Sequence, residues 1–571
     1  MFNKKCSTSI TIVICALLVV IISIAFILGS GYSKNSSEVS QEPEYMTKLF
    51  DKNKVLQINI DIDKKDFEDL KENAIDEEYY KANITIDGQT YENVGIRAKG
   101  NSSLYQVATS DNTNRYSFKI KLDEYVDNQN VYGLSKFVLN NNIGDATSMK
   151  EYMSYDLFNK MNVSTPGFAY AYIKINNEDW GLYLAVEPLE EEFLERNYGS
   201  SDGNLYKVET AQIDGNGFGE IMQQGHQGST QDNNELSQSQ QNEVNVNTIF
   251  EAVGKLNGNG GNLVYKDDNI SSYPSIFDYT VLDKTGKSDE KRLIKCIKNL
   301  NEGVDLEKSI DVDEVLRYFA VNTFLVNLDS YSGNIKHNYY LYEDSGMMQI
   351  VPWDLNLSFG AFFKLVDQMG GIKEGISLNQ KVINFPIDAP VTDSMEGSPL
   401  ISNLLAVDEY KERYHKYLQQ IRDEYINSGY FCEEINKVDK LISSYIEKDP
   451  TAFYTYDEYK KSLPSLKQYG IDRVKSIEEQ IEGSQPSENY GNEETTVDID
   501  ALGGQTDNIV NDEQQENMNN KMMEMMMKRK NIIKVGDSII PVNILVLAVS
   551  TLIMIIALIF ITKFRRKRVH C

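Results

Sequence analysis

Three polar side chains near the middle of the sequence could together carry out phosphoryl transfer. Asp329 opens a polar turn directly after an apolar run, Asn334 follows five positions later, and Asp354 comes directly after the apolar stretch "MMQIVPW". In phosphoryl transfer, one carboxylate accepts the proton of the attacking hydroxyl. An Asn carbonyl and a second carboxylate hold the Mg²⁺ ions that bridge the nucleotide phosphates. The sequence therefore predicts Asp329 as the catalytic base and Asn334 and Asp354 as metal ligands.

The spacing of this motif is informative, but the motif is short. D-x-x-x-x-N matches the second half of a protein-kinase catalytic loop, although "NLD" stands where H-R-D is usual. Asp354 is followed by "LNLSFG" where a kinase has "FG". Asp and Asn at the ends of apolar stretches also form turns that cap neighbouring elements. A metal-dependent site and a set of structural caps are therefore both open interpretations.

The composition disfavours several other classes of function. The formal net charge of −28 argues against nucleic acid as a partner, because phosphate backbones favour basic surfaces. Only four histidines occur, and there is no HExxH, paired CxxC or GxSxG pattern. Zinc hydrolases and serine hydrolases are therefore poorly supported. His337, two residues before the stretch "YYLY", is predicted to be structural.

Two long uncharged segments predict attachment to a membrane. Residues 10–28 and 544–561 are each long enough, at about 1.5 Å per residue, to cross about 30 Å of hydrocarbon. Basic residues flank both segments on their terminal sides, which predicts that both termini are cytoplasmic and that the bulk of the chain is extracytoplasmic. A cleaved signal peptide is the alternative for the first segment. The predicted location is the cell membrane.

The elements that must position the motif are predicted from the spacing of apolar residues. Alternation predicts strands in the first half of the chain, including a hairpin around Asp87 and Gly88. Helical spacing marks "DATSMKEYMSYDLFNKMNV" and most of the second half, while "HNYYLY" and "MMQIVPW" are predicted strands that lead to Asp354. Strands followed by helices indicate an α+β fold of bilobal character, with a ligand site near the junction.

Changes in composition predict how the chain is divided. A Gln-, Asn-, Gly- and Ser-rich stretch at about 210–261 is predicted to be a flexible insertion, because it has too few apolar residues to order itself. The other predicted segments are a membrane anchor or signal peptide at 1–29, a stalk at 30–54, the main domain at 55–482, a disordered acidic tether at 483–537, a membrane helix at 538–562 and a basic cytoplasmic tail at 563–571.

Five motifs occur in order between about Val55 and Tyr445: "GIRAKGNSS", "GLYLAVEPLEEEFLERNYG", "NLYKVE", "DSYSGNIKHNYYLY" and "VPWDLNLSFG". Together they resemble the spore-coat protein H (CotH) kinase-like family. The resemblance implies an atypical bilobal protein-kinase-like fold, with a sheet-rich N-lobe and a helix-rich C-lobe. It also implies that ATP and Mg²⁺ or Mn²⁺ are used to phosphorylate Ser or Thr of extracytoplasmic proteins, with Asp329 as the catalytic and Asp354 as the metal-binding aspartate. The two membrane segments and the insertion depart from the family pattern and leave a spore-coat location open.

The same resemblance assigns a phosphate-binding lysine and its partner. In a kinase sheet lobe, a strand lysine contacts the α- and β-phosphates and pairs with a glutamate on the next helix. Lys119 and Glu151 are predicted for these roles, with Lys99 and Lys121 as alternatives for the lysine. The competing interpretation is that lysines on an edge strand are solvated and that Glu151 favours the helix dipole.

Three further contacts to the nucleotide are predicted. Arg97 and Lys99 in "RAKGNSS" are expected as charge partners of the phosphates, with Gly100 lying over them, and a simple hairpin turn is the alternative. Glu187 closes the strand "GLYLAVE" where an adenine-contacting hinge would follow. Strand-end glutamates are common, so this residue also has a structural interpretation.

Two functional hypotheses follow. The first is a membrane-anchored kinase acting on proteins outside the cytoplasm, and the second is a non-catalytic surface adhesin or binding module on the same fold. The presence of Asp329, Asn334 and Asp354 together favours the enzyme, because a pure binder has no physical need for three metal-competent ligands.

Overall fold

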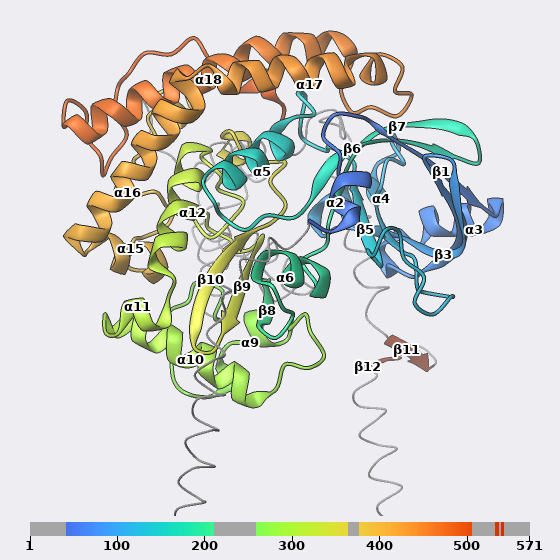
Figure 1. Cartoon of the computed structure of the whole chain (residues 1–571), viewed down its shortest axis with the longest axis horizontal. Helices are drawn as coiled ribbons and strands as arrows, with labels where there is room; N and C mark the ends of the chain where they lie inside the picture. Colours follow the sequence, from blue (N-terminus) through green and yellow to red (C-terminus); the bar gives the residue numbers. More distant parts are fainter. Residues whose placement is uncertain (1–41, 210–258, 364–375, 505–531, 536–537, 542–571) are drawn as a thin grey trace, which may run out of the picture. The chain divides into compact units, whose positions relative to one another are not determined.

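Seven strands from the first half of the chain close into a barrel (Figure 1). The structure, a computed structural model, describes residues 42–209, 259–363, 376–504, 532–535 and 538–541. The barrel strands are β1 (Leu56–Ile62), β2 (Tyr80–Ile86), β3 (Gln89–Lys99), β4 (Ser117–Lys121), β5 (Lys136–Asn140), β6 (Phe168–Ile175) and β7 (Glu178–Val186). Their order around the barrel is β1-β2-β3-β4-β5-β7-β6.

The barrel overturns the predicted bilobal kinase-like fold. Closure depends on parallel pairing of β1 with β6, in which Leu56 lies opposite Ala171. Alternation along the sequence predicts separate strands and one face of each, but it does not reveal which distant edges pair. The predicted hairpin at Asp87 and Gly88 is confirmed, because both residues have positive φ and connect β2 to β3.

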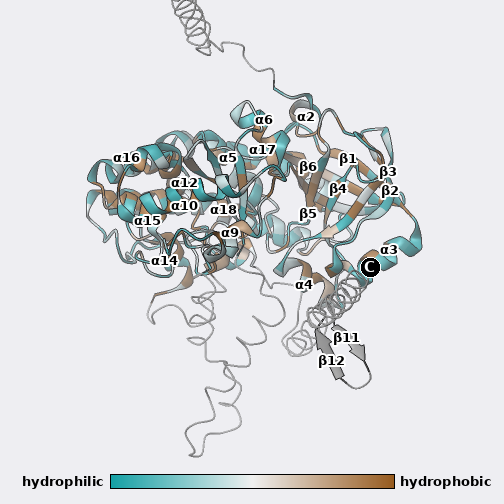
Figure 2. Ribbon diagram, turned by 90° about the horizontal axis from the view of Figure 1, so that it is seen from below, coloured by the Kyte–Doolittle hydropathy of each residue, from teal (hydrophilic) through white to brown (hydrophobic). Residues whose placement is uncertain are grey.

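Side chains alternate between an apolar barrel interior and an outer wall. On β4, Phe118 and Ile120 are completely buried, whereas Lys119 between them is partly exposed. Arg97 on β3 lies opposite Lys119, so both side chains belong to the outer wall, and Lys99 follows two residues later on the same face. Figure 2 shows hydrophobic residues concentrated on the barrel strands and hydrophilic ones on helices such as α3 and α16.

The second half of the chain surrounds a three-stranded antiparallel sheet with helices. Its strands are β8 (Asn204–Val208), β9 (Tyr339–Asp344) and β10 (Met347–Pro352), in the order β10-β9-β8. The two strands predicted to lead to Asp354 are thereby confirmed as β9 and β10. The helices of the described chain are α2 (Glu44–Lys48), α3 (Lys64–Glu72), α4 (Ser102–Thr109), α5 (Lys150–Lys160), α6 (Glu191–Tyr198), α9 (Pro274–Phe277), α10 (Lys287–Glu302), α11 (Leu306–Ser309), α12 (Val312–Phe324), α14 (Leu378–Ile383), α15 (Pro399–Leu405), α16 (Asp408–Gln420), a π-helical stretch (Ile421–Asn427), α17 (Tyr430–Ile446), α18 (Tyr456–Glu482) and three short 3₁₀ turns (Ala74–Asp76, Ile270–Ser272, Asp500–Leu502).

Two helices position the residues of the predicted site. α5 begins where the buried carboxylate of Asp145 accepts the backbone N–H of Lys150 at 2.8 Å, and it is buried on all sides as far as Phe158. α12 begins at Asp311, whose side chain accepts the N–H of Glu314 at 3.1 Å. Each carboxylate satisfies a backbone donor that the helix itself leaves unpaired.

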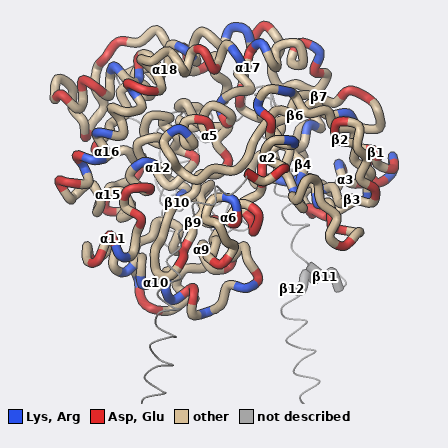
Figure 3. Tube along the Cα trace, in the orientation of Figure 1, with Lys and Arg blue, Asp and Glu red and all other residues tan. Residues whose placement is uncertain are grey.

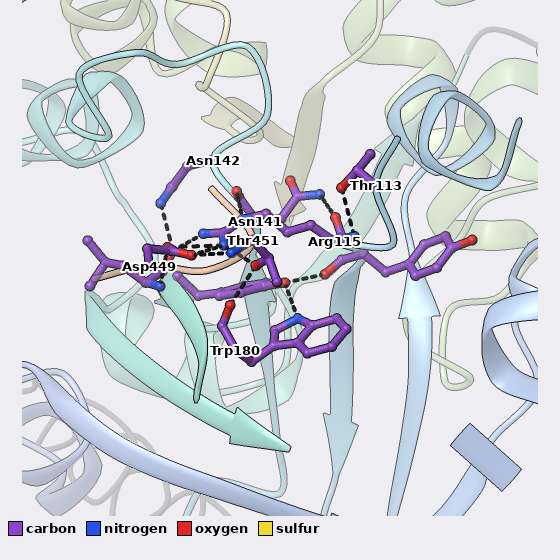
Figure 4. A network of polar contacts seen from close by, with 10 residues as sticks. Thr113, Arg115, Asn141, Asn142, Trp180, Asp449 and Thr451 are labelled. Carbon is purple, nitrogen blue, oxygen red and sulfur yellow. Dashed lines mark hydrogen bonds and ion pairs between the residues drawn. The ribbon is translucent and has the colours of Figure 1, made fainter. Parts of the chain in front are cut away.

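A buried ion pair fastens the barrel to the connection between α17 and α18 (Figure 4). Arg115 Nη1 lies 3.0 Å from Asp449 Oδ1, and both side chains are only 3% exposed. Arg115 also donates to the carbonyl oxygen of Asn141 at 3.0 Å and to the hydroxyl of Thr451 at 2.7 Å. The N–H of Leu182 on β7 donates to Asp449 Oδ2 at 2.8 Å.

The folded chain extends beyond the predicted main domain at both ends. The predicted stalk at 30–54 contributes α2, with Tyr45 buried, and the predicted tether at 483–537 contributes Val497, Ile499 and Leu502, all at most 2% exposed. Composition predicts a disordered tether, because the stretch has few apolar residues, yet its three apolar side chains pack into the core.

The predicted membrane-spanning helices are not part of the described fold. Segments 10–28 and 544–561 lie outside the described residues. Among the helices that the structure does describe, none combines the length and the apolar character needed to cross a bilayer. Residues Ser538–Pro541, predicted to begin the second membrane helix, form strand β12, which pairs with β11 (Ile532–Val535).

Candidate active site

A lysine and a glutamate of the predicted site are joined through an asparagine. Lys99, at the end of β3, donates from Nζ to Oδ1 of Asn140 at 2.8 Å. Asn140 donates from Nδ2 to both carboxylate oxygens of Glu151, at 2.9 and 3.0 Å. Asn140 ends β5 and Glu151 lies in the first turn of α5. The segment that connects β5 to α5 therefore places Asn140 beside Glu151.

Asp354 lies in a tight loop after β10 that α5 holds in place. Its backbone has a left-handed φ of 57°, which Asp adopts more readily than most residues. The N–H of Asp354 donates to the hydroxyl of Tyr155 at 3.3 Å, and the hydroxyls of Ser154 and Ser358 lie 2.7 Å apart. Glu151, Ser154 and Tyr155 share one face of α5 at helical spacing. One helix face thus positions both the glutamate and the Asp354 loop.

Asp329 is buried in the turn after α12 and is held by two side chains that precede β9. Its Oδ1 lies 2.9 Å from Nε2 of His337, and its Oδ2 accepts from Nδ2 of Asn338 at 3.0 Å. Burial opposes protonation of His337, but the adjacent Asp329 carboxylate raises the pKa of this histidine above its usual value. The histidine predicted to be structural therefore contacts the predicted base directly.

A second lysine lies near Asp354, on the three-stranded sheet. Lys207 on β8 forms an ion pair with Glu209. The positive charge of Lys207 acts to lower the pKa of Asp354 and that of Lys99. The Asp354 carboxylate is therefore influenced by one lysine from the barrel and one from the sheet.

Burial and mutual repulsion perturb the acidic groups of the site. Burial raises the pKa of Asp354, and repulsion by Asp329 adds to this effect, while Lys99 opposes it. Burial and repulsion by Asp354 raise the pKa of Glu151 to about 7. Burial also lowers the pKa of Lys99. Carboxylates that repel one another in a buried site are stabilised when a cation binds between them.

Asp354 fits a nucleotide-bound magnesium ion, with Asp329 as the second acidic group nearby. Within the described ranges, no group of three or more His, Cys, Asp or Glu side chains is arranged to hold a metal. In nucleotide sites, however, Mg²⁺ is held by one or two carboxylates together with water and substrate phosphates. The repulsion between Asp329 and Asp354 is the property that such a cation would relieve.

The structure places the other predicted ligands in contacts with partners outside this cluster. The pairs are Asn334 Oδ1 with the hydroxyl of Thr392 at 2.7 Å, Lys119 Nζ with Glu190 at 2.8 Å, and Arg97 Nη1 with Glu77 at 2.8 Å. The amide that contacts the predicted base is thus Asn338, and the lysine linked to Glu151 is Lys99.

Glu187 has a contact set typical of a structural residue. Its carboxylate is fully buried, accepts from the hydroxyl of Tyr45 at 2.8 Å and from the N–H of Gly167 at 2.7 Å, and forms an ion pair with Arg196. These contacts connect α2 and α6 to the barrel. They use both oxygens, so the structure does not bring Glu187 together with the nucleotide residues.

Three residues of the cluster were not assigned a role from the sequence. Asn140 and Asn338 read as ordinary turn residues beside strands, and Lys207 belongs to the motif "NLYKVE", whose role the sequence does not reveal. Only the positions of the two asparagines could have indicated a role. Asn140 lies on the outward face of β5, and Asn338 directly precedes β9.

Comparisons with known proteins bear on the same segments. The family described as CotH kinase protein matches residues 96–477, a range that includes Lys99, Glu151, Asp329 and Asp354. The chain is also 23% identical over 230 residues to "Inner spore coat protein H" of Bacillus subtilis (strain 168), which covers 40% of this chain and 51% of that protein. The chain thus spans about half the length of the curated relative it matches. Because the family match covers more than half of the sequence, this chain belongs to the CotH kinase protein family.

Proposed function

We propose that this protein is a phosphotransferase that moves the γ-phosphoryl group of ATP to a Ser or Thr hydroxyl. The observation that carries the proposal is the hydrogen-bonded chain from Lys99 through Asn140 to Glu151, on the same helix that holds the Asp354 loop. Beside it, the Asp329 carboxylate is held by His337 and Asn338. Membership in a family described as CotH kinase protein supports the same chemistry. Perturbed carboxylates gathered with a partly buried lysine are typical of functional sites.

In this proposal, Asp329 accepts the proton of the acceptor hydroxyl. As the acceptor oxygen forms a bond to the γ-phosphorus, the bond from that phosphorus to the bridging oxygen breaks and ADP leaves. His337 and Asn338 hold the Asp329 carboxylate in one orientation. Lys99 provides a positive charge for the phosphates, while Asn140 holds its ammonium group.

Asp354 would hold the divalent cation. When bound, Mg²⁺ or Mn²⁺ neutralises negative charge on the phosphates. The hydroxyl of Tyr155 on α5 holds the backbone of Asp354, so the loop that carries the carboxylate is positioned before the nucleotide arrives. Orientation in advance reduces the ordering cost during the reaction.

We propose that the acceptors are proteins outside the cytoplasm, such as proteins of a spore coat. Two observations support this class. The curated relative is named an inner spore coat protein, and the basic residues that flank the two apolar terminal segments favour an extracytoplasmic domain.

The test is transfer of label from γ-labelled ATP to a Ser-rich acceptor protein by the full-length chain with Mg²⁺ or Mn²⁺. We expect labelled phosphoserine or phosphothreonine with the wild type and none with Asp329→Asn. Folded protein that binds no nucleotide and transfers no label, yet attaches to a coat or cell surface, would contradict the proposal. That result would favour a non-catalytic surface adhesin or binding module.

A further inference from the structure

One face of the three-stranded sheet connects Lys207 to the segment that carries Asp354. In the pairing of β8 with β9, Lys207 stands opposite Tyr340. The Tyr340 ring meets the Trp353 ring edge-to-face, with 5.8 Å between centroids. Nζ of Lys99 lies 5.6 Å from the centroid of the same Trp353 ring. Lys99 therefore reaches Trp353 from the barrel, and Lys207 lies on the three-stranded sheet opposite the residue whose ring packs on Trp353.

The present partner of Lys207 holds it as a charged group beside the site. Glu209 forms the ion pair, and the Lys207 side chain is still 37% exposed while that of Glu209 is 11% exposed. Burial opposes the charge, but Glu209 raises the pKa of Lys207 well above its usual value. Lys207 also lies in register with Tyr340, whose ring packs on Trp353, the residue directly before Asp354.

We propose that Lys207 is a second phosphate-contacting lysine, which binds the terminal phosphates of the nucleotide whose cation Asp354 holds. The inference rests on the proposed function and adds a ligand from the three-stranded sheet to it. A triphosphate carries more negative charge than Lys99 alone can neutralise, and a lysine is a compact, flexible charge suited to phosphate. Glu209 is the internal competitor that holds the ammonium group until the phosphates replace it. The alternative is a purely structural ion pair on β8.

The test compares the binding of ATP, ADP and adenosine, each with Mg²⁺, to full-length wild type and variants by calorimetry. Lys207→Met should weaken ATP binding by roughly 10- to 100-fold, because a hydrogen bond to a charged group is lost, and should leave adenosine binding unchanged. Lys207→Arg should recover part of the loss. Lys174→Met is the matched control, since Lys174 is also a partly exposed strand lysine paired with a carboxylate, that of Asp179. It should bind all three ligands like the wild type.

Glu209→Gln provides a test that does not depend on the folding of the lysine variants. Removing the competing carboxylate should strengthen ATP binding severalfold and leave adenosine binding unchanged. Two results would overturn the inference while the proposed function stands. One is ATP binding by Lys207→Met equal to that of the wild type, and the other is no gain in Glu209→Gln. A wild type that binds no ATP would instead refute the proposed function itself, and the inference with it.

Discussion

At the scale of single residues, amide side chains connect the charged groups of the site. Asn140 accepts from Lys99 and donates to Glu151, and Asn338 donates to Asp329. An amide has both a donor and an acceptor and does not titrate, so it can join a cation to an anion at any pH. The site is thus held in one geometry although burial perturbs the pKa values of its acids.

Glu314 on α12 predicts a measurable dependence of stability on pH. Burial raises the pKa of Glu314 well above its usual value, and repulsion by Asp311 adds to the shift. The folded state therefore binds a proton that the unfolded state releases above about pH 4.5, so the free energy of unfolding falls as pH rises through this range. Glu314→Gln should be more stable than wild type near pH 8, because a neutral amide avoids the burial of a charge that destabilises the wild type at this pH.

Denaturant unfolding of the wild type and of Glu314→Gln, measured at several values between about pH 5 and about pH 8, checks this prediction. The stability advantage of the variant should shrink steadily toward pH 5. A difference between the two proteins that does not change with pH would show that Glu314 is ionised in the folded state.

The sequence singles out Asp329 and Asp354 as candidates, whereas it does not reveal the residues that contact them. A carboxylate after an apolar strand, as at Asp354, is a visible exception to the pattern of the neighbouring residues. Asn140 is not, because Asn is common wherever a strand ends. Choosing Lys99 over Lys119 required knowing that Glu190 lies beside Lys119, which depends on contacts far apart in the sequence.

At the scale of elements, the site depends on how the barrel meets the helices. α5 connects β5 to β6 and presents Glu151 and Tyr155 to the Asp354 loop. The Arg115–Asp449 pair fastens the same barrel to the α17–α18 connection. Relative movement between these elements would separate Lys99 from Asp354.

Breaking the Arg115–Asp449 pair should be strongly destabilising. Asp449→Ala leaves the buried guanidinium of Arg115 without its carboxylate, and such a loss typically costs about 3–5 kcal/mol. The exposed pair of Lys54 and Asp87 is the control, since its side chains are 41% and 32% exposed. Lys54→Ala should cost about 0–1 kcal/mol. Urea unfolding measures both, and equal small losses would contradict a structural role for the buried pair.

Individual elements were largely predictable and their assembly was not. The hairpin at Asp87 and Gly88, the helix at α5 and the strands β9 and β10 follow from local turn chemistry and periodicity. The closed barrel does not, because the β1–β6 pairing joins stretches that no local pattern relates. A kinase-like motif order therefore led to a wrong expectation for the fold.

At the scale of the whole molecule, the described segments that end before residue 210 and begin after residue 258 both hydrogen-bond to Ser275. The N–H of Glu209 donates to the carbonyl oxygen of Ser275 at 3.0 Å, and the N–H of Ser275 donates to that of Asn259 at 3.1 Å.

Acidic and basic residues are interspersed over the described elements (Figure 3). The charge of −28 is therefore spread over the chain.

Removing residues 212–258 should leave the fold intact. Glu209 and Asn259, the described residues on either side, both hydrogen-bond to Ser275, and loop closure depends only weakly on loop length. The melting temperature should change by less than about 3 °C, and transfer activity should persist. A loss of more than about 10 °C, measured by differential scanning fluorimetry, would show that the removed segment contributes to the core.

The most direct test of the central claim is nucleotide binding measured beside label transfer in Asp354→Ala and Asp329→Ala. Asp354→Ala should abolish transfer and weaken metal-dependent ATP binding, because the cation loses a ligand. Asp329→Ala should also abolish transfer but bind ATP much like the wild type, because a base acts on the incoming hydroxyl. Both variants should remain folded, because relief of the repulsion between the two carboxylates offsets part of the loss of the contacts of Asp329 with His337 and Asn338. Wild-type nucleotide binding and transfer in both variants, or unfolding of both, would contradict the account.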